Sequence, residues 1–386
     1  MHRKNIVIWA PGLFDSIGGI QNYLKSLISA LCSISDDIGV YVLSKNDSDR
    51  ILLEKFNSRV TWLTLDPSLP FRRLTYGLIS LIKTFQKQPD LVICGHVNFS
   101  EAFYPLTLHP KIKSWVICYG IECWRVNGFF KKKLLKSVTR TISISNYTRS
   151  QLIKSELINP DTSEVLPVTF DEDRFVISQD DGAMIRKKLG ISLEDKVILT
   201  VARLSSKERY KGYDKVIEIF PQLLKTFSNL RYVIVGDGDD KVRLSNIIED
   251  LKIKDRVHLT GNIDEKELPA YYNACDVFCM PSKGEGFGIV FLEAMSCGKI
   301  VIAGNKDGSK DALCDGMLGF LIDPDNTFEL YETLRAVLSR SIPHELVYDP
   351  HKLRQRVIEK FGKKAFKNRL KQLLDLQGWN FTECVE

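Results

Sequence analysis

The chain has 386 residues, of which 44% are hydrophobic, 26% charged and 10% aromatic, and its formal net charge is +6. This composition is typical of a globular protein of about two to three domains, and it excludes a disordered or collagen-like chain. No apolar run reaches the roughly 18 residues that a bilayer span requires, so we expect no integral membrane protein. The apolar stretch near the N-terminus is too short for a secretory signal, and we expect a cytoplasmic location.

Short β-branched runs alternate with longer amphipathic segments along the first half of the chain. We expect strands over residues 5–10, 39–43, 60–65, 91–95, 114–119 and 141–145. Helices are expected between them, for example over residues 20–34 and 72–86. This alternation predicts βαβ units and a parallel sheet, hence a Rossmann-like N-terminal domain over residues 1–170.

The same alternation restarts after a looser segment, residues 166–182, which we interpret as an interdomain linker. Further strands are expected over residues 197–201, 232–235, 257–260, 277–280, 300–303 and 319–322. They predict a second Rossmann-like domain over residues 171–351. The chain then ends in an expected helix, 352–374, and the segment 352–386 is a candidate to pack back on the first domain. Ligands of such sheets bind beyond the carboxyl ends of the strands, so we expect two α/β domains facing across a cleft.

The positive charge lies in the first half, where residues 1–170 hold 21 Lys and Arg against 13 Asp and Glu. Its densest segment, FFKKKLLKSVTR, covers residues 129–140. The segment predicts either an interfacial helix for an anionic membrane surface or a solvated helix whose apolar residues enter the core. No zinc-finger, helix-turn-helix or RNA-binding pattern accompanies it, so we expect no nucleic-acid partner.

The nine cysteines do not predict a disulfide framework or a metal site. Most lie inside apolar segments, no CxxC pair occurs, and the six histidines are not grouped at ligand spacing. We interpret them as buried thiols and expect no metal.

The segment with the clearest chemistry is PSKGEGFGIVFLEAMSCGK, residues 281–299. A strand ends, glycines alternate with Glu285 and Phe287, and a helix begins. The main chain of Gly286, Phe287, Gly288 and Ile289 then presents N–H groups at the positive end of a helix, which suits phosphate oxygens. Glu285 precedes the helix and Glu293 lies on it, so both can face one ligand.

This string resembles the paired-glutamate motif of the retaining glycosyltransferases of family 4, which have the GT-B fold and take a sugar from a nucleoside diphosphate. The resemblance covers nearly the whole chain and is closest over residues 201–324. It implies that Glu285 contacts hydroxyls of the donor sugar, and that Glu293 holds the ribose hydroxyls.

A second similar segment, VARLSSKERYKGYDKVIEIF, covers residues 201–220. The resemblance implies that Arg203 and Lys211 bind the diphosphate, two cations answering the charge that builds on the leaving phosphate. The residues ERY are inserted before Lys211, so Lys207 is the alternative second cation. With two cations in place, the resemblance implies a reaction without a metal ion.

Two further positions follow in the second domain. Gly236, in YVIVGDGDD, resembles the family loop in which glycine lets the main chain pass close to the nucleotide. Asp264 follows the expected strand 257–260 and is either a base contact, which would favour guanine, or part of a capping box with Glu267.

The first domain supplies three candidate residues. Gly18 and Gly19 follow the first strand and resemble the glycine-rich loop at which phosphate or acceptor approaches a helix. His96 ends the strand 91–95, where the family carries a histidine that faces the donor sugar. The next strand ends in Tyr119-Gly120, where relatives often have His-Gly, so a second catalytic histidine is not expected.

The resemblance therefore implies a retaining, metal-independent hexosyltransferase with no cofactor, whose donor is a GDP-sugar, with mannose as the candidate, or a UDP-sugar. The expected acceptor is a saccharide or lipid-linked molecule of surface polysaccharide synthesis, with the protein peripheral on the inner face of the membrane. Neither a GxGxxG after the first strand nor a Walker A sequence occurs, which argues against oxidoreductases and P-loop kinases. Two alternatives remain open: a sugar-nucleotide epimerase or hydrolase of the same fold, and a non-catalytic partner subunit.

Overall fold

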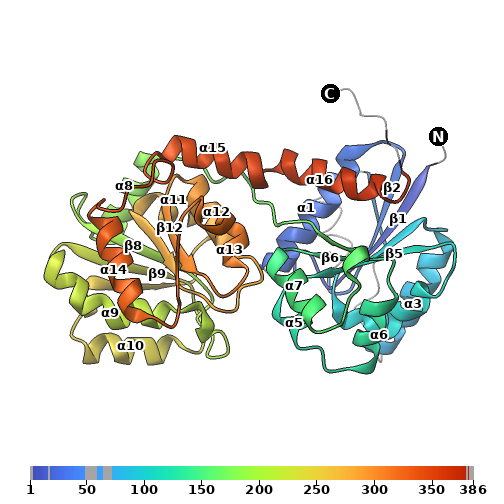
Figure 1. Cartoon of the computed structure of the whole chain (residues 1–386), viewed down its shortest axis with the longest axis horizontal. Coiled ribbons are helices and arrows are strands. Elements are labelled where there is room, and N and C mark those ends of the chain that lie inside the picture. The colour runs from blue at the N-terminus through green and yellow to red at the C-terminus, as the bar shows by residue number, and fades with distance from the viewer. Residues whose placement is uncertain (1–2, 16–17, 48–58, 64–71, 380, 382–386) are drawn as a thin grey trace. The chain divides into compact units, whose positions relative to one another are not determined.

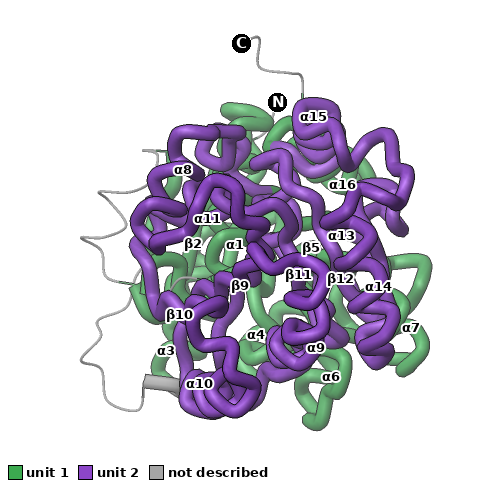
Figure 2. The backbone as a smooth tube through the Cα atoms, turned by 90° about the vertical axis from the view of Figure 1, so that its left-hand side faces the viewer, with its two compact units in different colours: residues 1–169, 363–386 green, residues 170–362 purple. Residues whose placement is uncertain are grey.

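The computed structural model describes residues 3–15, 18–47, 59–63, 72–379 and 381. The chain divides into two compact units, shown in different colours in Figure 2. Unit 1 comprises residues 1–169 and 363–386, and unit 2 comprises residues 170–362. Each unit is a layered α/β structure built on its own parallel sheet (Figure 1).

Within the described residues, unit 1 has a seven-stranded parallel sheet in the order β3-β2-β1-β4-β5-β6-β7. Its strands are β1 Lys4–Ala10, β2 Ile38–Ser44, β3 Val60–Trp62, β4 Leu91–Cys94, β5 Lys113–Cys118, β6 Arg140–Ser143 and β7 Ser163–Val165. The first six correspond to the expected strands, although residues 64 and 65 of the expected third strand lie outside the described residues. The sequence interpretation missed β7, which has three residues and no apolar run.

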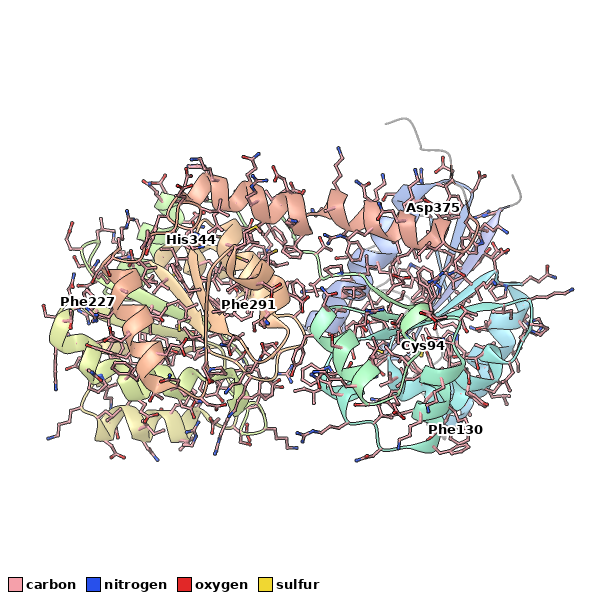
Figure 3. All side chains as sticks on the ribbon, in the orientation of Figure 1. Cys94, Phe130, Phe227, Phe291, His344 and Asp375 are labelled. Atoms are coloured by element: carbon pink, nitrogen blue, oxygen red, sulfur yellow. The ribbon has the colours of Figure 1, made fainter. Side chains whose placement is uncertain are left out.

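Helices cover both faces of this sheet. They are α1 Gly19–Ile34, α3 Arg72–Gln86, α4 Ser100–Thr107, α5 Ile121–Trp124, α6 Phe129–Ser137, α7 Asn146–Lys154 and α16 Lys363–Asp375. The helices α3, α4 and α6 pack beside one another, and α1 packs against α16. Cys94 lies in the interior of unit 1, whereas Phe130 lies at its outer margin (Figure 3). The core therefore lies between the sheet and its helix layers.

The helix α3 buries several polar side chains and exposes several apolar ones, although Leu81 packs against the core. Tyr76, Ser80 and Thr84 are buried, and Thr84 Oγ1 accepts a hydrogen bond of 3.0 Å from the indole N–H of Trp9. The exposed face carries large apolar side chains: Leu78, Ile82 and Phe85. Since amphipathic helices normally direct the apolar face inward, α3 leaves unusual apolar area uncovered.

The residues of α6 fit both interpretations of the basic segment, each in part. Leu134 and Leu135 are buried, as the solvated-helix interpretation expects. Phe129 and Phe130 are 67% and 42% exposed, as the interfacial interpretation expects. The lysines at positions 132, 133 and 136 are exposed as well.

In the described part of unit 2, six parallel strands have the order β10-β9-β8-β11-β12-β13. They are β8 Lys196–Val201, β9 Leu230–Val235, β10 Val257–Gly261, β11 Val277–Met280, β12 Ile300–Gly304 and β13 Phe320–Ile322, as the sequence predicts. The helices are α8 Gln179–Lys188, α9 Tyr213–Thr226, α10 Lys241–Asp250, α11 Leu268–Ala274, α12 Ile289–Ser296, α13 Ser309–Ala312, α14 Thr327–Leu338 and α15 Pro350–Phe361. Figure 1 shows α9, α10 and α14 on one side of this sheet, and α8, α11, α12 and α15 on the other.

Short 3-10 helices complete the two units: η1 Val97–Phe99, η2 Pro160–Thr162, η3 Arg209–Lys211, η4 Lys254–Arg256, η5 Glu265–Glu267 and η6 Cys314–Gly316. The expected linker, 166–182, is shorter in the structure, because Ser178 caps α8 and the helix begins at Gln179. The side chain of Ser178 accepts a hydrogen bond from the Asp181 N–H.

The single helix expected over residues 352–374 is wrong. The structure has two helices, α15 and α16, separated by Gly362, whose ψ of 167° is extended. A side chain at this position would collide with Glu172 and with the carbonyl oxygen of Ile358, so glycine permits the close approach. The division into units assigns α15 to unit 2 and α16 to unit 1, where Phe366 packs edge-on against Tyr23.

No helix among the described residues is long and apolar enough to cross a membrane. The eight described cysteines are free thiols, and seven of them are buried, which confirms the interpretation of buried thiols.

Candidate active site

The loop that follows β11 positions Glu285. Because carboxyl ends of parallel strands meet at one edge, this loop lies near those that follow β8 and β12. The Nζ atom of Lys211 is 2.6 Å from Glu285 Oε1. Both side chains are mostly buried, with 14% and 15% of their surface exposed. The structure thus brings together two predicted site residues that are 74 positions apart in sequence.

A buried carboxylate from the next loop holds the main chain of Glu285. Asp307 Oδ2 accepts hydrogen bonds of 2.7 Å from the Glu285 N–H and from Ser282 Oγ. Burial raises the pKa of Asp307, against the hydrogen bonds from Ser309, Glu285 and Ser282 that lower it. The sequence interpretation missed this residue, and its only signal was an Asp-Gly-Ser turn after the expected strand 300–303.

The helix α12 begins at Ile289, with Gly288 as N-cap at φ +90° and no side-chain cap. The first N–H groups of a helix have no partner within it, so the segment of Gly286, Phe287, Gly288 and Ile289 retains the geometry expected of an oxyanion or phosphate site. The ring of Phe287 is buried and packs edge-on against Phe361. Its side chain is therefore part of the core, and only its main chain can serve a ligand.

Glu293 lies on α12, little more than one turn from its start, and is 6% exposed. The hydroxyl of Tyr272 donates a hydrogen bond of 2.8 Å to Glu293 Oε2. Burial raises the pKa of Glu293 to about 7, and the Tyr272 hydrogen bond opposes this shift. Tyr272 is itself fully buried, and the sequence interpretation did not identify it.

Arg203 and Lys211 are linked by Glu208, a residue of the inserted ERY segment. Arg203 Nη1 is 3.2 Å from Glu208 Oε1, and Lys211 Nζ is 3.9 Å from Glu208 Oε2. The Arg203 side chain is 66% exposed. Lys211, rather than the exposed Lys207, is the lysine that contacts Glu285.

The remainder of the insertion is anchored to the interior of unit 2. Arg209 Nε donates to Asp240 Oδ1 at 3.0 Å, and Arg243 and the Tyr213 hydroxyl donate to the same carboxylate. Hydrogen bonds from Arg243 lower the pKa of Asp240. The insertion thus supplies Arg209 and Tyr210 to η3, a fixed turn that ends at Lys211.

Gly236 has a packing role in the structure. Its φ is +136°, and a side chain there would collide with the carbonyl oxygen of Ala202, directly before Arg203. Glycine is therefore required for the loops after β8 and β9 to approach each other.

Asp264 is exposed and caps η5, since its Oδ1 accepts a hydrogen bond of 2.9 Å from the Lys266 N–H. Asp264 therefore caps η5, but it does not form the expected capping box, because the Glu267 side chain accepts a hydrogen bond from Lys188 Nζ at 2.6 Å instead. A contact between Asp264 and a base stays a prediction.

In unit 1, the loop between β1 and α1 leads to Gly18 and Gly19. Gly18 is the N-cap of α1, and an added side chain at Gly19 would meet no atom within 4 Å. The buried Asp47 accepts hydrogen bonds from the Leu13 and Phe14 N–H groups at 2.6 and 2.9 Å. Among the described residues, Gly19 therefore has open space beside it, whereas a side chain at Gly18 would meet Oε1 of Gln21 at 2.7 Å.

His96 follows β4 and is half-buried. Its Nδ1 accepts a hydrogen bond of 3.1 Å from the Asn98 N–H, which leaves the proton of the neutral ring on Nε2. Burial lowers the pKa of His96, Glu122 opposes the shift and Lys131 adds to it. A neutral imidazole is therefore ready to donate one hydrogen bond from Nε2. The Tyr119 ring lies 6.4 Å from it, centroid to centroid.

The predicted site residues are divided between the units. Gly18, Gly19 and His96 belong to unit 1, and the others belong to unit 2. Among the described residues, no group of three or more His, Cys, Asp or Glu side chains could hold a metal ion.

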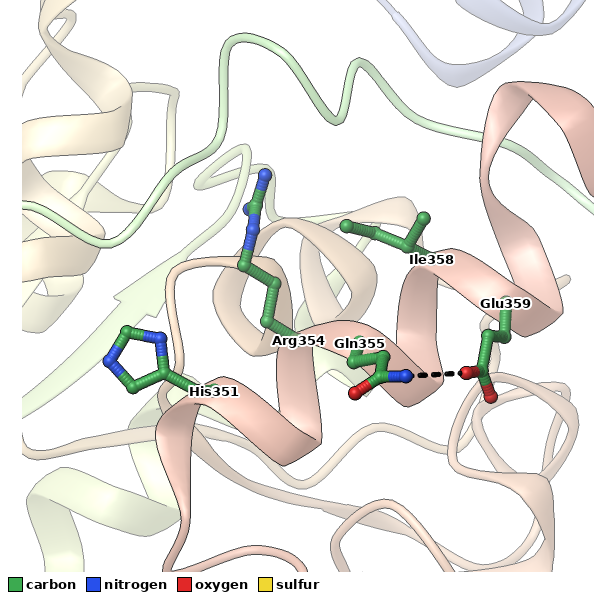
Figure 4. Close-up of a pocket in the computed structure, with 5 residues that line it drawn as sticks. All are labelled: His351, Arg354, Gln355, Ile358 and Glu359. Carbon is green, nitrogen blue, oxygen red and sulfur yellow. Dashed lines mark hydrogen bonds between the residues drawn. The ribbon is translucent and has the colours of Figure 1, made fainter.

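A surface pocket of about 370 Å³ lies along α15 (Figure 4). Its lining residues are His351, Arg354, Gln355, Ile358 and Glu359. No predicted site residue lines it, so it is not the site defined by Glu285 and Lys211.

Solved structures share this fold. HepE from Anabaena in complex with UDP superposes with a TM-score of 0.79 at 20% identity, covering 97% of this chain and 100% of HepE. Two Rossmann-like domains with parallel sheets, together with this likeness, assign the chain to the GT-B fold.

Sequence comparison identifies the family. The model described as "Glycosyl transferases group 1" matches residues 182–364. A mannosyltransferase of Corynebacterium glutamicum, described as GDP-mannose-dependent and acting on a monoacylated phosphatidylinositol monomannoside, is 30% identical over 88% of this chain and 90% of its own length. The chain therefore belongs to the group 1 glycosyltransferases.

A further relative is the GDP-mannose-dependent phosphatidylinositol monomannoside mannosyltransferase of Mycolicibacterium smegmatis. It is 34% identical over 188 residues, which are 47% of this chain. The match spans about half of that relative's length, 48%.

Proposed function

We propose that this glycosyltransferase moves a hexose from a nucleoside diphosphate sugar to a lipid-linked or saccharide acceptor with retention of configuration. The observation that carries the proposal is the buried pair of Lys211 and Glu285 at the edge where the strands of unit 2 end. The lysine can bind a phosphate and the adjacent carboxylate can accept hydrogen bonds from sugar hydroxyls. Both lie inside the segment that matches the family model.

In this proposal the residues of unit 2 bind the donor. Arg203 and Lys211 bind the diphosphate, together with the N–H groups at the start of α12. Glu285 accepts hydrogen bonds from the sugar, and Glu293 accepts them from the ribose. Because the cations supply the positive charge, no metal ion takes part.

The reaction itself follows a displacement on one face of the sugar. The bond between the anomeric carbon and the β-phosphate oxygen breaks, and the acceptor oxygen bonds to the same face. The leaving phosphate takes the proton of the acceptor hydroxyl. Glu285 orients the sugar rather than attacking it, and His96 donates a hydrogen bond to the sugar from Nε2.

The donor is GDP-mannose in the first instance, because a relative that aligns over 88% of the chain at 30% identity is named as GDP-mannose-dependent. A UDP-sugar is the competing donor, since HepE structures contain UDP or UDP-glucose. Thermal unfolding with GDP, UDP and ADP separates them, because a bound ligand raises the melting temperature by mass action. If UDP alone raises the melting temperature, a UDP-sugar rather than GDP-mannose is the donor in this proposal.

Transfer is tested with radiolabelled GDP-mannose and phosphatidylinositol mannoside or diacylglycerol acceptors. We expect a labelled lipid product and retained anomeric configuration by NMR. Free mannose alone would indicate a hydrolase, and an epimerised nucleotide sugar would indicate an epimerase. Donor binding without any turnover would favour a non-catalytic partner subunit.

We also propose that unit 1 binds an anionic membrane surface through α3 and α6. Neither helix contains an acidic residue, and both expose aromatic or aliphatic side chains beside lysines. Each basic residue near an anionic bilayer contributes about 1 kcal/mol of attraction. Named relatives act on lipids, including an α-monoglucosyldiacylglycerol synthase of Streptococcus pneumoniae.

Vesicle sedimentation tests this surface. We expect binding to vesicles with phosphatidylglycerol and weaker binding to phosphatidylcholine alone. Changing Phe129 and Phe130 to Ser should weaken binding about a hundred-fold or more, since each ring loses apolar burial of about 1.5–3 kcal/mol. The matched control is Phe328→Ser on α14, where the side chain is 69% exposed. Equal loss in the control would contradict the membrane proposal.

A further inference from the structure

Asp307 is a fully buried carboxylate that belongs to no predicted site. It follows β12 and receives three hydrogen bonds at its two oxygens. The Ser309 N–H donates to Oδ1 at 2.9 Å, while Ser282 Oγ and the Glu285 N–H each donate to Oδ2 at 2.7 Å. Burying a carboxylate is costly unless such donors surround it, so the arrangement is built around its charge.

The same loop holds the Glu285 main chain on its other side. The Gly308 N–H donates to the carbonyl oxygen of Glu285 at 2.9 Å. A side chain at Gly308 would collide with the carbonyl oxygen of Gly286. The peptide groups before and after Glu285 are therefore both fixed by the Asp307-Gly308 turn.

The Glu285 carboxylate depends on this support. The side chain contacts Lys211 at 2.6 Å, and a shift of the main chain would move the carboxylate away from that lysine. We propose that Asp307 is a positioning residue that fixes Glu285 for the donor sugar. The inference rests on the proposed function, in which Glu285 contacts the sugar hydroxyls.

An amide of the same shape cannot replace the carboxylate. In Asp307→Asn one oxygen becomes an NH₂ group, which only donates hydrogen bonds. In one orientation the NH₂ faces the Glu285 N–H, and in the other it faces the Ser309 N–H. In both orientations the NH₂ group points at a main-chain N–H group, so two hydrogen-bond donors repel each other. The Asp307-Gly308 turn must then shift.

The test measures the kcat of Asp307→Asn and its affinity for the free nucleoside diphosphate, which lacks the sugar. We expect kcat to fall by about ten- to a hundred-fold, whereas the Kd of GDP or UDP changes by less than about three-fold. This split follows because Glu285 contacts sugar rather than nucleotide. A wild-type kcat in folded protein would overturn the inference.

A double variant separates positioning from general stability. If Asp307 acts through Glu285, Asp307→Asn should add less than about two-fold to the loss caused by Glu285→Gln alone. Fully additive losses would overturn the inference. If Glu285→Gln is itself as active as the wild type, the proposed function fails first, so the two failures are distinguishable.

Two further variants guard against a folding artefact. Asp195→Asn is the matched control, because Asp195 is also buried in unit 2 and accepts from Arg231 Nε at 2.9 Å and the Ser192 N–H at 3.3 Å. We expect it to retain wild-type kcat. If Asp307→Asn does not fold, Gly308→Ala tests the same turn by collision, since its φ of −67° suits alanine. An equal loss in Asp195→Asn, or an unaffected Gly308→Ala, would overturn the inference.

Discussion

The loops after β1 in unit 1 and after β11 in unit 2 are built in the same way and used differently. In each, a buried aspartate from the loop after the next strand accepts main-chain N–H groups: Asp47 holds Leu13 and Phe14, and Asp307 holds Glu285. In unit 2 the held residue is a carboxylate beside Lys211. In unit 1 the held residues, Leu13 and Phe14, are apolar and carry no charge. The same arrangement thus supports a charged contact in unit 2 and an apolar segment in unit 1.

This difference predicts that removing charge from the unit 2 loops after β8 and β11 has the largest effect. Glu285→Ala and Arg203→Ala should lower kcat by about a hundred- to a thousand-fold, because in the proposed function both contact groups whose charge or position changes as the glycosidic bond breaks. Initial rates with saturating donor measure this, and circular dichroism verifies folding. Wild-type transfer by both variants would remove the proposed site.

The buried Glu293 should make stability depend on pH. Its pKa rises from an ordinary 4.5 to about 7, so the folded state binds the proton more tightly than the unfolded state. The resulting stabilisation is complete below about pH 4 and is lost as the pH rises through about 7. Relative to Glu293→Gln, the free energy of unfolding should fall by about 2–3 kcal/mol between pH 5 and pH 8. Urea unfolding at both pH values measures this. If the free energy of unfolding changed equally with pH in the wild type and in Glu293→Gln, the prediction would be wrong.

In the proposed function Glu293 contacts the ribose, so removing its side chain should mainly weaken donor binding. Glu293→Ala should weaken donor affinity by about ten- to a hundred-fold, since a lost charged hydrogen bond is worth roughly 1.5–3 kcal/mol. Isothermal titration with the nucleoside diphosphate measures the change, and kcat at saturation should fall less. A pure kcat defect would assign Glu293 to the reacting sugar instead.

In unit 1, His96→Ala should lower kcat by about ten-fold through loss of one neutral hydrogen bond to the sugar. His96→Gln keeps a donor and is the matched variant for partial rescue. Reduced stability with unchanged kcat would show that His96 is a core histidine.

The smallest effect is expected from chelation. Adding EDTA should leave the rate within about two-fold, because Arg203, Lys211 and the start of α12 supply the positive charge. A large loss that Mg²⁺ or Mn²⁺ restores would contradict a metal-independent reaction.

Local sequence patterns predicted most of the fold because βαβ units leave strong apolar periodicity. The bounds of α3 were predicted, but the sequence analysis did not predict its buried face, which in the structure includes Ser80 and Thr84 and leaves Leu78 and Ile82 exposed. Tertiary packing around Trp9 decides that face, and no local pattern encodes it.

The candidate site shows the same limit. The motifs identified Lys211 and Glu285, and the rule for strand ends placed their loops together. The sequence analysis did not identify Asp307 and Tyr272, because a polar turn residue and an aromatic helix residue occur at many positions with no functional role. Only the three-dimensional contacts reveal that one holds the Glu285 main chain and the other holds the Glu293 carboxylate.

The pairing of Lys211 with Glu285, and of Arg203 with Glu208, has a consequence for selectivity. Opposite charges cancel across these loops, so the field that would draw any passing anion is weak. Inorganic phosphate alone would have to compete with the carboxylates for the cations. A molecule carrying both a diphosphate and sugar hydroxyls can satisfy the cations and the released carboxylates together. In the proposed function, these loops therefore favour the intact donor over its fragments.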